Sequence, residues 1–361
     1  MLEIFEIKSS IKNYIVSIEK DSILSIIKDR SYFVMIDSIV SDRWPSLNLD
    51  NFVRVVAEED KKNLNMVSEL IENLKNHGAT RGSKILSIGG GITQDLTTFC
   101  ASSYMRGISW VYAPTTLLGM VDSCIGGKSS LNVGKYKNIA GNYYPPDKVI
   151  IDINFCKTLS NQQLIEGLFE AVKICYVYSD QSFKRHISYF DSSKDLHSLN
   201  FEKIVFNSLI SKKAIIEEDE FDKGRRLLLN FGHTFGHAIE GASNFKISHG
   251  VAVALGMVAA FHLSVQLNLI MKDNIKASAL LTHLHTLLDK VEGLIELTSS
   301  IDMKVAFNNF KSDKKHSKEL FVVILFDNDG APLRHQLNRN VVNDLLIINS
   351  FNYLKREKDE I

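Results

Sequence analysis

The chain of 361 residues has few cysteines, and they follow neither a metal-binding nor a disulfide pattern. The four are Cys100, Cys124, Cys156 and Cys175, and no two of them have CxxC spacing. This scarcity argues against a thiolate metal site and against a small secreted domain held by disulfides. We therefore expect reduced cysteines and a cytoplasmic protein.

The chain also lacks an excess of charge of either sign. Lys+Arg and Asp+Glu both number 42, so no net charge favours nucleic acid or an anionic membrane. The N-terminal stretch contains acidic residues and no continuous apolar core, so we expect no signal peptide. We recognise no uncharged apolar run of about 18 residues and expect no membrane-spanning helix.

Hydrophobic residues, by contrast, make up 45 % of the chain, enough to bury a large core. The length suits about two domains. Short apolar runs alternate with helical patterns and Gly-rich turns up to residue 158, and helical patterns dominate afterwards. We therefore predict an α/β domain with a parallel, Rossmann-like sheet at 1–158 and an all-α domain at 159–361. The predicted strands include 32–36, 84–88, 108–112 and 149–151, with a later strand at 320–326.

Three consecutive glycines, Gly89, Gly90 and Gly91, follow one of the predicted strands and precede a helix predicted at 95–104. Glycines in this position let backbone N–H groups approach a pyrophosphate near a helix N-terminus. A plain tight turn explains the triplet equally well when it is taken alone. Asp37 ends another predicted strand, where a carboxylate would face a ligand crevice.

Histidines are concentrated in and after the segment 227–240. His233 and His237 have i, i+4 spacing, so both lie on one face if the segment is helical. His249 follows at the start of a second apolar stretch. These side chains could be core histidines bonded to backbone carbonyls. Alternatively, His233, His249 and a carboxylate could bind a divalent metal with open positions for substrate.

Several motifs occur in order between Gly89 and Met257: GGGITQDLTTFCASSYMRG, PTTLL, VDSCIGGKSSLN, EGLFEAVK, NFGHTFGHAIE and SHG. Together they resemble 3-dehydroquinate synthase and the wider sugar phosphate cyclases. The resemblance implies an N-terminal NAD-binding domain, a helical metal- and substrate-binding domain, a site in the cleft between them, and a homodimer. It also implies a catalytic NAD and a divalent metal, zinc before cobalt.

In such an enzyme the substrate is a small sugar phosphate, 3-deoxy-D-arabino-heptulosonate 7-phosphate. NAD transiently oxidises a ring hydroxyl, phosphate is eliminated, the ketone is reduced again, and an intramolecular aldol reaction closes the carbocycle. The product is 3-dehydroquinate of the shikimate pathway, made by a phosphate-eliminating lyase.

The resemblance also assigns residues. The metal ligands are Glu170, His233 and His249. The catalytic residues are Asp122, Lys128, Lys173, Asp222 and His237. Phosphate contacts are Lys128, Asn138, one of Lys314 and Lys315, and Arg106 from across a dimer, while the substrate carboxylate contacts are Lys212, Arg226 and Asn230. NAD contacts are Asp37, Glu59, Lys62, Gly89, Gly90, Gly91, Asp95, Thr115, Thr116, Lys137 and Thr158.

Each residue also has a structural explanation. The side chains of Lys62 and Lys212 could belong to a solvated face. Asp122 could cap a helix. Glu170 could simply form an i, i+3 ion pair with Lys173.

Three residues depart from the family pattern. Asp222 stands where the family has a glutamate, Gln94 where it has a glycine, and Val251 where it has a glutamate. A shorter carboxylate at position 222 would change its reach by about 1.5 Å, enough to slow a reaction. The carboxylate contacts remain, which favours the heptulosonate phosphate. The alternatives are a cyclase for another sugar phosphate such as sedoheptulose 7-phosphate, an NAD- and metal-dependent alcohol dehydrogenase, and a non-catalytic nucleotide-binding protein.

Overall fold

The structure, a computed structural model, describes residues 3–29, 31–47, 52–134, 136–191 and 195–355. Contacts divide the chain into two compact units. Unit 1 comprises Met1–Gly167 and Asp195–Glu220, and unit 2 comprises Leu168–Lys194 and Phe221–Ile361. This division differs from the boundary predicted after residue 158. The chain returns to unit 1 because helix α7 (Phe201–Glu218) packs on the segment η4 (Gly119–Ser123) of that unit.

Unit 1 is built on a seven-stranded sheet with the strand order β1-β2-β9-β6-β5-β3-β4. Strands β1 and β2 pair antiparallel, and the other neighbours pair parallel. The predicted parallel, Rossmann-like sheet is therefore confirmed. The strands are β1 (Glu3–Ile7), β2 (Tyr14–Ile18), β3 (Tyr32–Asp37), β4 (Phe52–Val55), β5 (Lys84–Gly89), β6 (Ser109–Pro114) and β9 (Lys148–Ile151).

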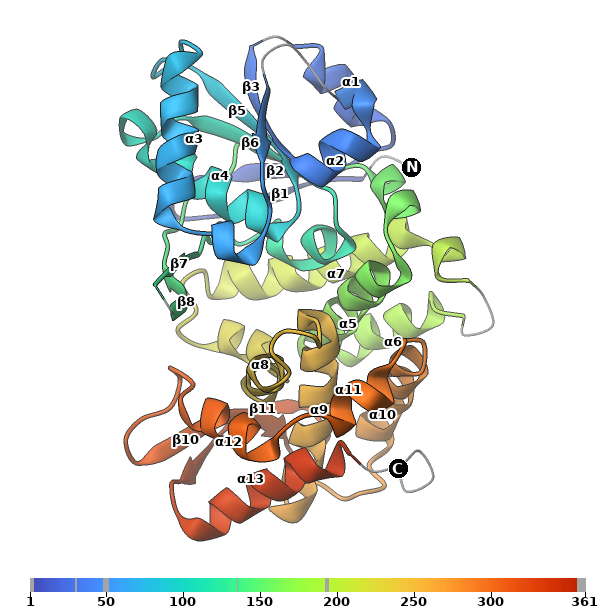
Figure 1. Ribbon diagram of the computed structural model, residues 1–361. Helices are drawn as coiled ribbons and strands as arrows, with labels where there is room; N and C mark the ends of the chain where they lie inside the picture. Colours follow the sequence, from blue (N-terminus) through green and yellow to red (C-terminus); the bar gives the residue numbers. More distant parts are fainter. Residues whose placement is uncertain (1–2, 30, 48–51, 135, 192–194, 356–361) are drawn as a thin grey trace. The chain divides into compact units, whose positions relative to one another are not determined.

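Helices of unit 1 pack on this sheet (Figure 1). The helix after the glycine triplet begins at Gly91, four residues before its predicted start, so the triplet forms the strand-to-helix turn itself. Besides α7, the helices are α1 (Ser22–Ile27), α2 (Ser38–Arg43), α3 (Leu64–Asn76) and α4 (Gly91–Ser103). A separate two-stranded hairpin consists of β7 (Leu131–Val133) and β8 (Tyr136–Ala140).

The strand order reverses between β3 and β5. These neighbours run parallel, but the chain leaves β3 through α2 to the edge strand β4, whereas it leaves β5 through α4 to β6 on the other side. In open α/β sheets, ligands bind in the crevice outside the carboxyl ends of strands at such a point. Asp37 and Gly89 are the last residues of the two strands.

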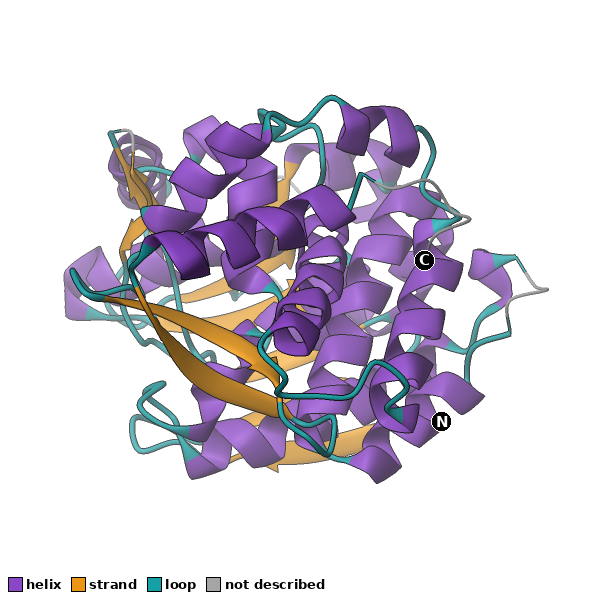
Figure 2. Ribbon diagram, turned by 90° about the horizontal axis from the view of Figure 1, so that it is seen from below, coloured by secondary structure: helices purple, strands orange, loops and turns teal. Residues whose placement is uncertain are grey.

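In its described residues, unit 2 consists of helices and one β-hairpin. Figure 2 shows the helices of the whole protein in purple and its strands in orange. The hairpin is an addition to the expected all-α domain, and the strand predicted at 320–326 is confirmed as β10 (Leu320–Phe326), which pairs with β11 (Pro332–Asn338). Helix α5 (Asn161–Tyr178) begins in unit 1 and ends in unit 2. The other helices are α6 (Asp180–Ser188), α8 (His233–Ala242), α9 (His249–Gln266), α10 (Ile275–Leu288), α11 (Leu294–Ser299), α12 (Met303–Lys311) and α13 (Val341–Tyr353).

Helix α9 corrects one expectation from the sequence. It is uncharged over 18 residues, with a mean hydropathy of 1.4, and is therefore long and apolar enough by composition to cross a membrane. The prediction that the chain contains no uncharged apolar run of about 18 residues is therefore wrong. The helix is 78 % buried and packs against α8, α10, α13 and β10, so it serves as the core helix of unit 2.

The four cysteines are free thiols in the interior. Burial raises the pKa of Cys100, Cys124 and Cys156 to about 12. The free thiols agree with the expectation that these four cysteines form no disulfide framework.

Candidate active site

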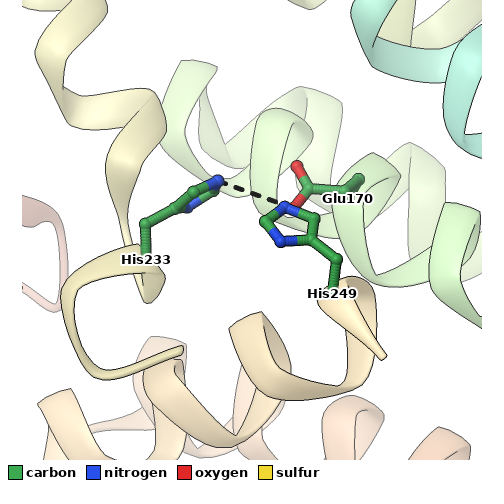
Figure 3. Close-up of side chains that lie close together, drawn as sticks. All are labelled: Glu170, His233 and His249. Carbon is green, nitrogen blue, oxygen red and sulfur yellow. Dashed lines mark ion pairs between the residues drawn. The ribbon is translucent and has the colours of Figure 1, made fainter. Parts of the chain in front are cut away.

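Three side chains predicted as metal ligands converge in unit 2 (Figure 3). Glu170 lies in α5, and His233 and His249 are the first residues of α8 and α9. The Nε2 atom of His249 is 3.7 Å from Glu170 Oε1, and that of His233 is 3.9 Å from the same oxygen. All three ligand atoms lie within 4.8 Å of one another. Glu170 Oε1 is fully buried and has no hydrogen-bond partner among the described residues.

The outer nitrogen of each histidine has a partner that fixes the ring. His233 Nδ1 is 3.2 Å from the carbonyl oxygen of Phe231, and His249 Nδ1 is 3.2 Å from Glu240 Oε2. If each Nδ1–H donates to its acceptor, both Nε2 lone pairs face the buried Glu170 oxygen. Two lone pairs and a carboxylate oxygen repel one another unless a cation lies among them. The donor set therefore fits a divalent metal with open positions.

Glycines bring the two histidine helices close together. A Cβ atom on Gly256 of α9 would lie 2.0 Å from the carbonyl oxygen of Gly232, which precedes α8. Gly232 itself has a φ of 78°, a conformation that glycine adopts without strain. Since α8 and α9 touch backbone to backbone, their first residues meet, with 5.3 Å between the ring centroids of His233 and His249.

Lys173 forms an ion pair with the second oxygen of Glu170, Oε2, and both side chains are buried. The structural explanation of Glu170 as an i, i+3 partner of Lys173 is thus correct for one oxygen. The other oxygen, Oε1, faces the Nε2 atoms of the two histidines and is available to bind a metal with them. The ion-pair and metal-ligand explanations are compatible.

The environment fixes the charge of the histidines. Burial, with the nearby Lys173 ammonium, holds the pKa of His233 well below its usual value. Burial and the charge of Lys315 lower the pKa of His237 to about 4. Burial also opposes charge on His249, but the Glu240 hydrogen bond and the Glu170 charge outweigh it and raise that pKa. His233 and His237 are therefore neutral at pH 7 and can offer a lone pair.

Of the two lysines proposed for phosphate, Lys315 is the one near α8. Its Nζ atom is 2.9 Å from Asp313 Oδ2 and 3.4 Å from Thr234 Oγ1. Lys314 is exposed. Lys315 therefore lies beside the histidine helix α8.

The predicted carboxylate contacts of unit 2 lie on the segment that leads into α8. Arg226 is buried, and Asn230 donates to the carbonyl of Leu227 at 3.1 Å, both within the 3-10 helix η7 (Arg225–Asn230). Asp222 precedes this helix with a φ of 63°. Aspartate adopts this left-handed conformation more readily than glutamate, which gives a local reason for the shorter acid at this position.

Several predicted NAD contacts meet at the carboxyl edge of the sheet in unit 1. Thr115, after β6, donates its N–H to the carbonyl of Gly89 at 3.0 Å. A Cβ atom on Gly89 would lie 2.5 Å from Thr93, and one on Gly90 would lie 3.1 Å from Thr116. Glycine is thus needed at these two positions because Thr93 and Thr116 lie too close for a side chain, as well as for the turn. Asp37 accepts from Ile39 N at 2.8 Å and so caps α2.

A second group of predicted contacts surrounds the β7–β8 hairpin. Lys62 Nζ is 3.1 Å from Asp95 Oδ2 and 2.6 Å from Asn138 Oδ1. Lys137 Nζ is 3.5 Å from Glu59 Oε1. Lys62 is only 6 % exposed, so the explanation of this lysine as part of a solvated face is wrong.

Asp122 and Lys212 form an ion pair in unit 1, with 2.8 Å between Asp122 Oδ1 and Lys212 Nζ. The same ammonium also donates to the carbonyls of Asp122 and Ile125. Lys212 is buried, so the solvated-face explanation fails here too. Asp122 is the fourth residue of η4, which excludes its explanation as a helix N-cap.

The remaining predicted residues lie apart from these groups in unit 1. Arg106 is exposed in a left-handed turn with φ 68°, next to Gly107. Lys128 is exposed, and its Nζ atom lies 6.0 Å from the ring centroid of Tyr143. Thr158 is exposed, and its carbonyl accepts from Arg43 at 2.8 Å.

The other two departures from the family pattern are buried. Gln94 exchanges two hydrogen bonds with Ser123, which follows Asp122. Val251 lies inside α9 and is 2 % exposed.

Sequence reasoning missed Glu240 and Asp313. Glu240 follows His237 by three residues on α8, and this i, i+3 spacing was the available signal. Asp313 orients Lys315, which belongs to the same short charged run.

Two family models match the chain. The model of the 3-dehydroquinate synthase N-terminal domain covers residues 52–166, and that of the C-terminal domain covers residues 167–316. A 3-dehydroquinate synthase of Dehalococcoides mccartyi is 38 % identical over 282 residues, which are 78 % of this chain and 77 % of the relative. One from Saccharolobus solfataricus is 35 % identical over 276 residues, 75 % of this chain and 76 % of the relative.

Solved structures support the fold. A 2-deoxy-scyllo-inosose synthase complexed with carbaglucose-6-phosphate, NAD+ and Co2+ has a TM-score of 0.82 and 23 % identity over 97 % of this chain and 99 % of its own. The 2-epi-5-epi-valiolone synthase ValA of Streptomyces hygroscopicus, with NAD+ and Zn2+ bound, has a TM-score of 0.78 and 21 % identity over 96 % and 98 %. A probable glycerol dehydrogenase from Sinorhizobium meliloti is less similar, with a TM-score of 0.59, 14 % identity, and coverage of 94 % and 95 %. At these identities the likeness shows the fold alone.

Proposed function

The chain belongs to the 3-dehydroquinate synthase family, and from that premise we propose that it converts 3-deoxy-D-arabino-heptulosonate 7-phosphate into 3-dehydroquinate and phosphate. The observation that carries the proposal is the buried oxygen of Glu170 facing the Nε2 atoms of two histidines. An alcohol oxidised during such a reaction must lose its hydroxyl proton as well as a hydride. A metal site beside the substrate meets the first requirement, and NAD meets the second.

Glu170, His233 and His249 would hold the divalent cation, zinc before cobalt. When bound, such a cation polarises the substrate hydroxyl and lowers its pKa. Glu240 keeps the Nε2 atom of His249 turned toward Glu170 through the 3.2 Å contact with Nδ1. Lys173 neutralises part of the Glu170 charge and can orient a hydroxyl.

The glycine triplet and the N-terminus of α4 would bind the NAD pyrophosphate, since glycine leaves the backbone N–H groups accessible. NAD held there would supply the transient oxidation and the later reduction of the substrate. Asp37, Thr115 and Thr116 border this turn. Lys62 and Asp95, bonded to each other, fix the β7–β8 hairpin next to it.

We assign the substrate's phosphate to Lys128, Asn138 and Lys315, and its carboxylate to Arg226 and Asn230. Lys212 was expected to contact the carboxylate. Since its three N–H donors already have acceptors at Asp122 and Ile125, we give it the role of holding Asp122. Because its pKa is lowered to about 4, His237 would face the substrate as a neutral imidazole that can exchange hydrogen bonds, rather than as a cation for phosphate.

The test is to incubate the protein with NAD, zinc and the heptulosonate phosphate, and to measure phosphate release and carbocycle formation. We expect turnover, no net NADH, and loss of turnover with a chelator. Net NADH would instead indicate an alcohol dehydrogenase. Phosphate release from none of the sugar phosphates in a panel would exclude a cyclase.

The departures at Asp222, Gln94 and Val251 support a second candidate, a cyclase that acts on another sugar phosphate such as sedoheptulose 7-phosphate. That substrate has no carboxylate for Arg226 to bind. The panel therefore includes it, and a preference for it over the heptulosonate phosphate would replace the first proposal. The homodimer suggested by Arg106 stays a prediction.

A further inference from the structure

The segment that carries Asp122 is an unusual helix. In η4 (Gly119–Ser123) a backbone hydrogen bond runs from Cys124 N to the carbonyl of Gly119, five residues back, as in a π-helix. Such wide turns are rare and occur often at functional sites. The backbone around Asp122 therefore depends on contacts from outside the helix more than an α-helix would.

Three consecutive carbonyls at the end of η4 accept hydrogen bonds from buried side chains. Ser208 Oγ of α7 donates to Val121 O at 2.9 Å. Lys212, also of α7, donates to Asp122 O. Gln94 Nε2 of α4 donates to Ser123 O at 2.8 Å. We call Gln94, Ser208 and Lys212 the carbonyl clamp.

Gln94 makes the most specific contact of the three. Its amide donates to the carbonyl of Ser123, and its Oε1 accepts from Ser123 Oγ at 2.7 Å. The side chain is 4 % exposed, so water does not replace these bonds easily. Gln94 lies in the first turn of α4, three residues after Gly91. It therefore connects the glycine turn directly to the residue beside Asp122.

We propose that Gln94 is a positioning residue, which fixes Asp122 relative to the glycine turn. The inference rests on the proposed function, in which the turn binds NAD. We take Asp122, a catalytic residue by the family resemblance, to orient the hydroxyl that is oxidised. Hydride transfer requires the reacting atoms to be held about 3–3.5 Å apart. Gln94 joins the glycine turn to the residue beside Asp122, so it sets this distance without touching the substrate.

The variant Gln94→Met keeps the length of the side chain and removes both hydrogen bonds. We expect kcat to fall by about one to two orders of magnitude, because small misplacements are costly in hydride transfer. KM for the substrate and for NAD should stay within about twofold, since no substrate contact is lost. The deuterium isotope effect on kcat, with substrate labelled at the carbon that is oxidised, should increase. Ser123→Ala, which removes one of the two bonds, should show the same changes to a smaller degree.

Gln266→Met is the matched control. Gln266 lies in unit 2, and its Nε2 also donates to a backbone carbonyl, that of Leu346 at 3.1 Å. Its replacement removes this bond and the contacts of the same Nε2 atom with Ser350 and His262, all far along the chain from Asp122. Kinetics and isotope effects of this variant should match the wild type. Equal kinetics for Gln94→Met and Gln266→Met would overturn the inference.

Amide hydrogen exchange of residues 119–125 tests the clamp without turnover. Gln94→Met should accelerate exchange in this segment, and Gln266→Met should not. If the wild type releases no phosphate from any sugar phosphate, the proposed function fails, and the exchange comparison alone decides the inference. Unchanged exchange in Gln94→Met would overturn it.

Discussion

Glu240 determines which nitrogen of His249 faces the buried Glu170 oxygen. Its carboxylate accepts a hydrogen bond from Nδ1. Burial lowers the pKa of His249, and this hydrogen bond acts against that effect and raises it. Outer partners of this kind orient metal-binding histidines and raise their basicity. Glu240 should therefore contribute to metal affinity without touching the cation.

Replacing Glu240 by alanine should weaken zinc binding by about 10-fold to 100-fold, the usual effect of losing such a partner. Competition with a chromogenic chelator measures the change. Glu296→Ala, on the exposed surface of α11, serves as the control and should bind zinc like the wild type. Equal zinc affinity in Glu240→Ala and the wild type would show that Glu240 does not support the site.

At the residue scale, the sequence predicted which side chains come together as metal ligands, but not the contacts that orient each of them. The family resemblance, rather than spacing alone, selected Glu170 as the partner of His233 and His249. The segment 227–240, however, is not one helix, since η7 ends at Asn230 and Gly232 turns the chain before α8. The contact between Glu240 and His249 depends on the path of the chain between α8 and α9, and no periodicity encodes that path.

Among the elements, α8 and α9 show how backbone contact produces the site. Their closest approach is at Gly256, where any side chain would collide with the carbonyl of Gly232. Each helix contributes its first residue to the histidine pair, so the spacing of the helices sets the spacing of the rings. A change in helix packing should thus appear as a change in metal binding.

Gly256→Ala should force the two helices apart. We expect a destabilisation of about 1–3 kcal/mol, as for other overpacked cores, and a marked loss of zinc affinity. Urea unfolding and a zinc titration measure the two effects. Gly82→Ala is the control, since the nearest atom to its added Cβ would be 3.9 Å away. A stable Gly256→Ala protein with normal zinc affinity would contradict the role given to this contact.

Elements with strong periodicity were predictable, whereas their partners were not. The continuous apolar run LFVVILF predicted β10 at its observed bounds, and α7 spans Phe201–Glu218. Yet α7 belongs to unit 1, because an apolar helix face does not specify the surface that it covers. The wide turn η4 has no sequence signature, because its hydrogen bonds depend on side chains from α4 and α7.

Across the whole molecule, the histidines with lowered pKa values are concentrated in unit 2. Their pKa values are lowered chiefly by burial, so the folded state holds them neutral while an unfolded chain would protonate them near pH 6.5. Stability from this source is fully present above that pH and is lost as the pH falls toward about 4. The histidines are His186, His233, His237, His283, His285, His316 and His335.

Buried acids in unit 1 have the opposite effect. Burial raises the pKa of Asp37, Asp95 and Asp152 above the usual value. These carboxyl groups therefore bind protons more readily in the folded protein than in the unfolded chain. Acidification removes the free-energy cost of burying their charges. As the pH falls below about 6.5, unit 2 should lose stability before unit 1 does.

His283 allows this to be tested away from the metal ligands. It packs edge-on against His186 with 5.4 Å between ring centroids, and burial lowers its pKa to about 4. Between pH 7.5 and 5.5 this one group should cost about 1 kcal/mol of unfolding free energy, and His283→Phe should remove that loss. Urea unfolding at both pH values measures it, with exposed His197→Phe as the control. An identical loss in His283→Phe and the wild type would contradict the assignment.

The discontinuity of unit 1 has a consequence for how the protein is made. A ribosome releases the whole sheet first, then a stretch that belongs to the other unit, and only afterwards the helix α7 that completes the first. Unit 1 thus cannot complete its folding until synthesis has passed Glu220. We therefore expect the two units to fold together rather than one after the other. A gene cut at Gly167 would yield two fragments, and the one with the sheet would lack both Ser208 and Lys212 beneath Asp122.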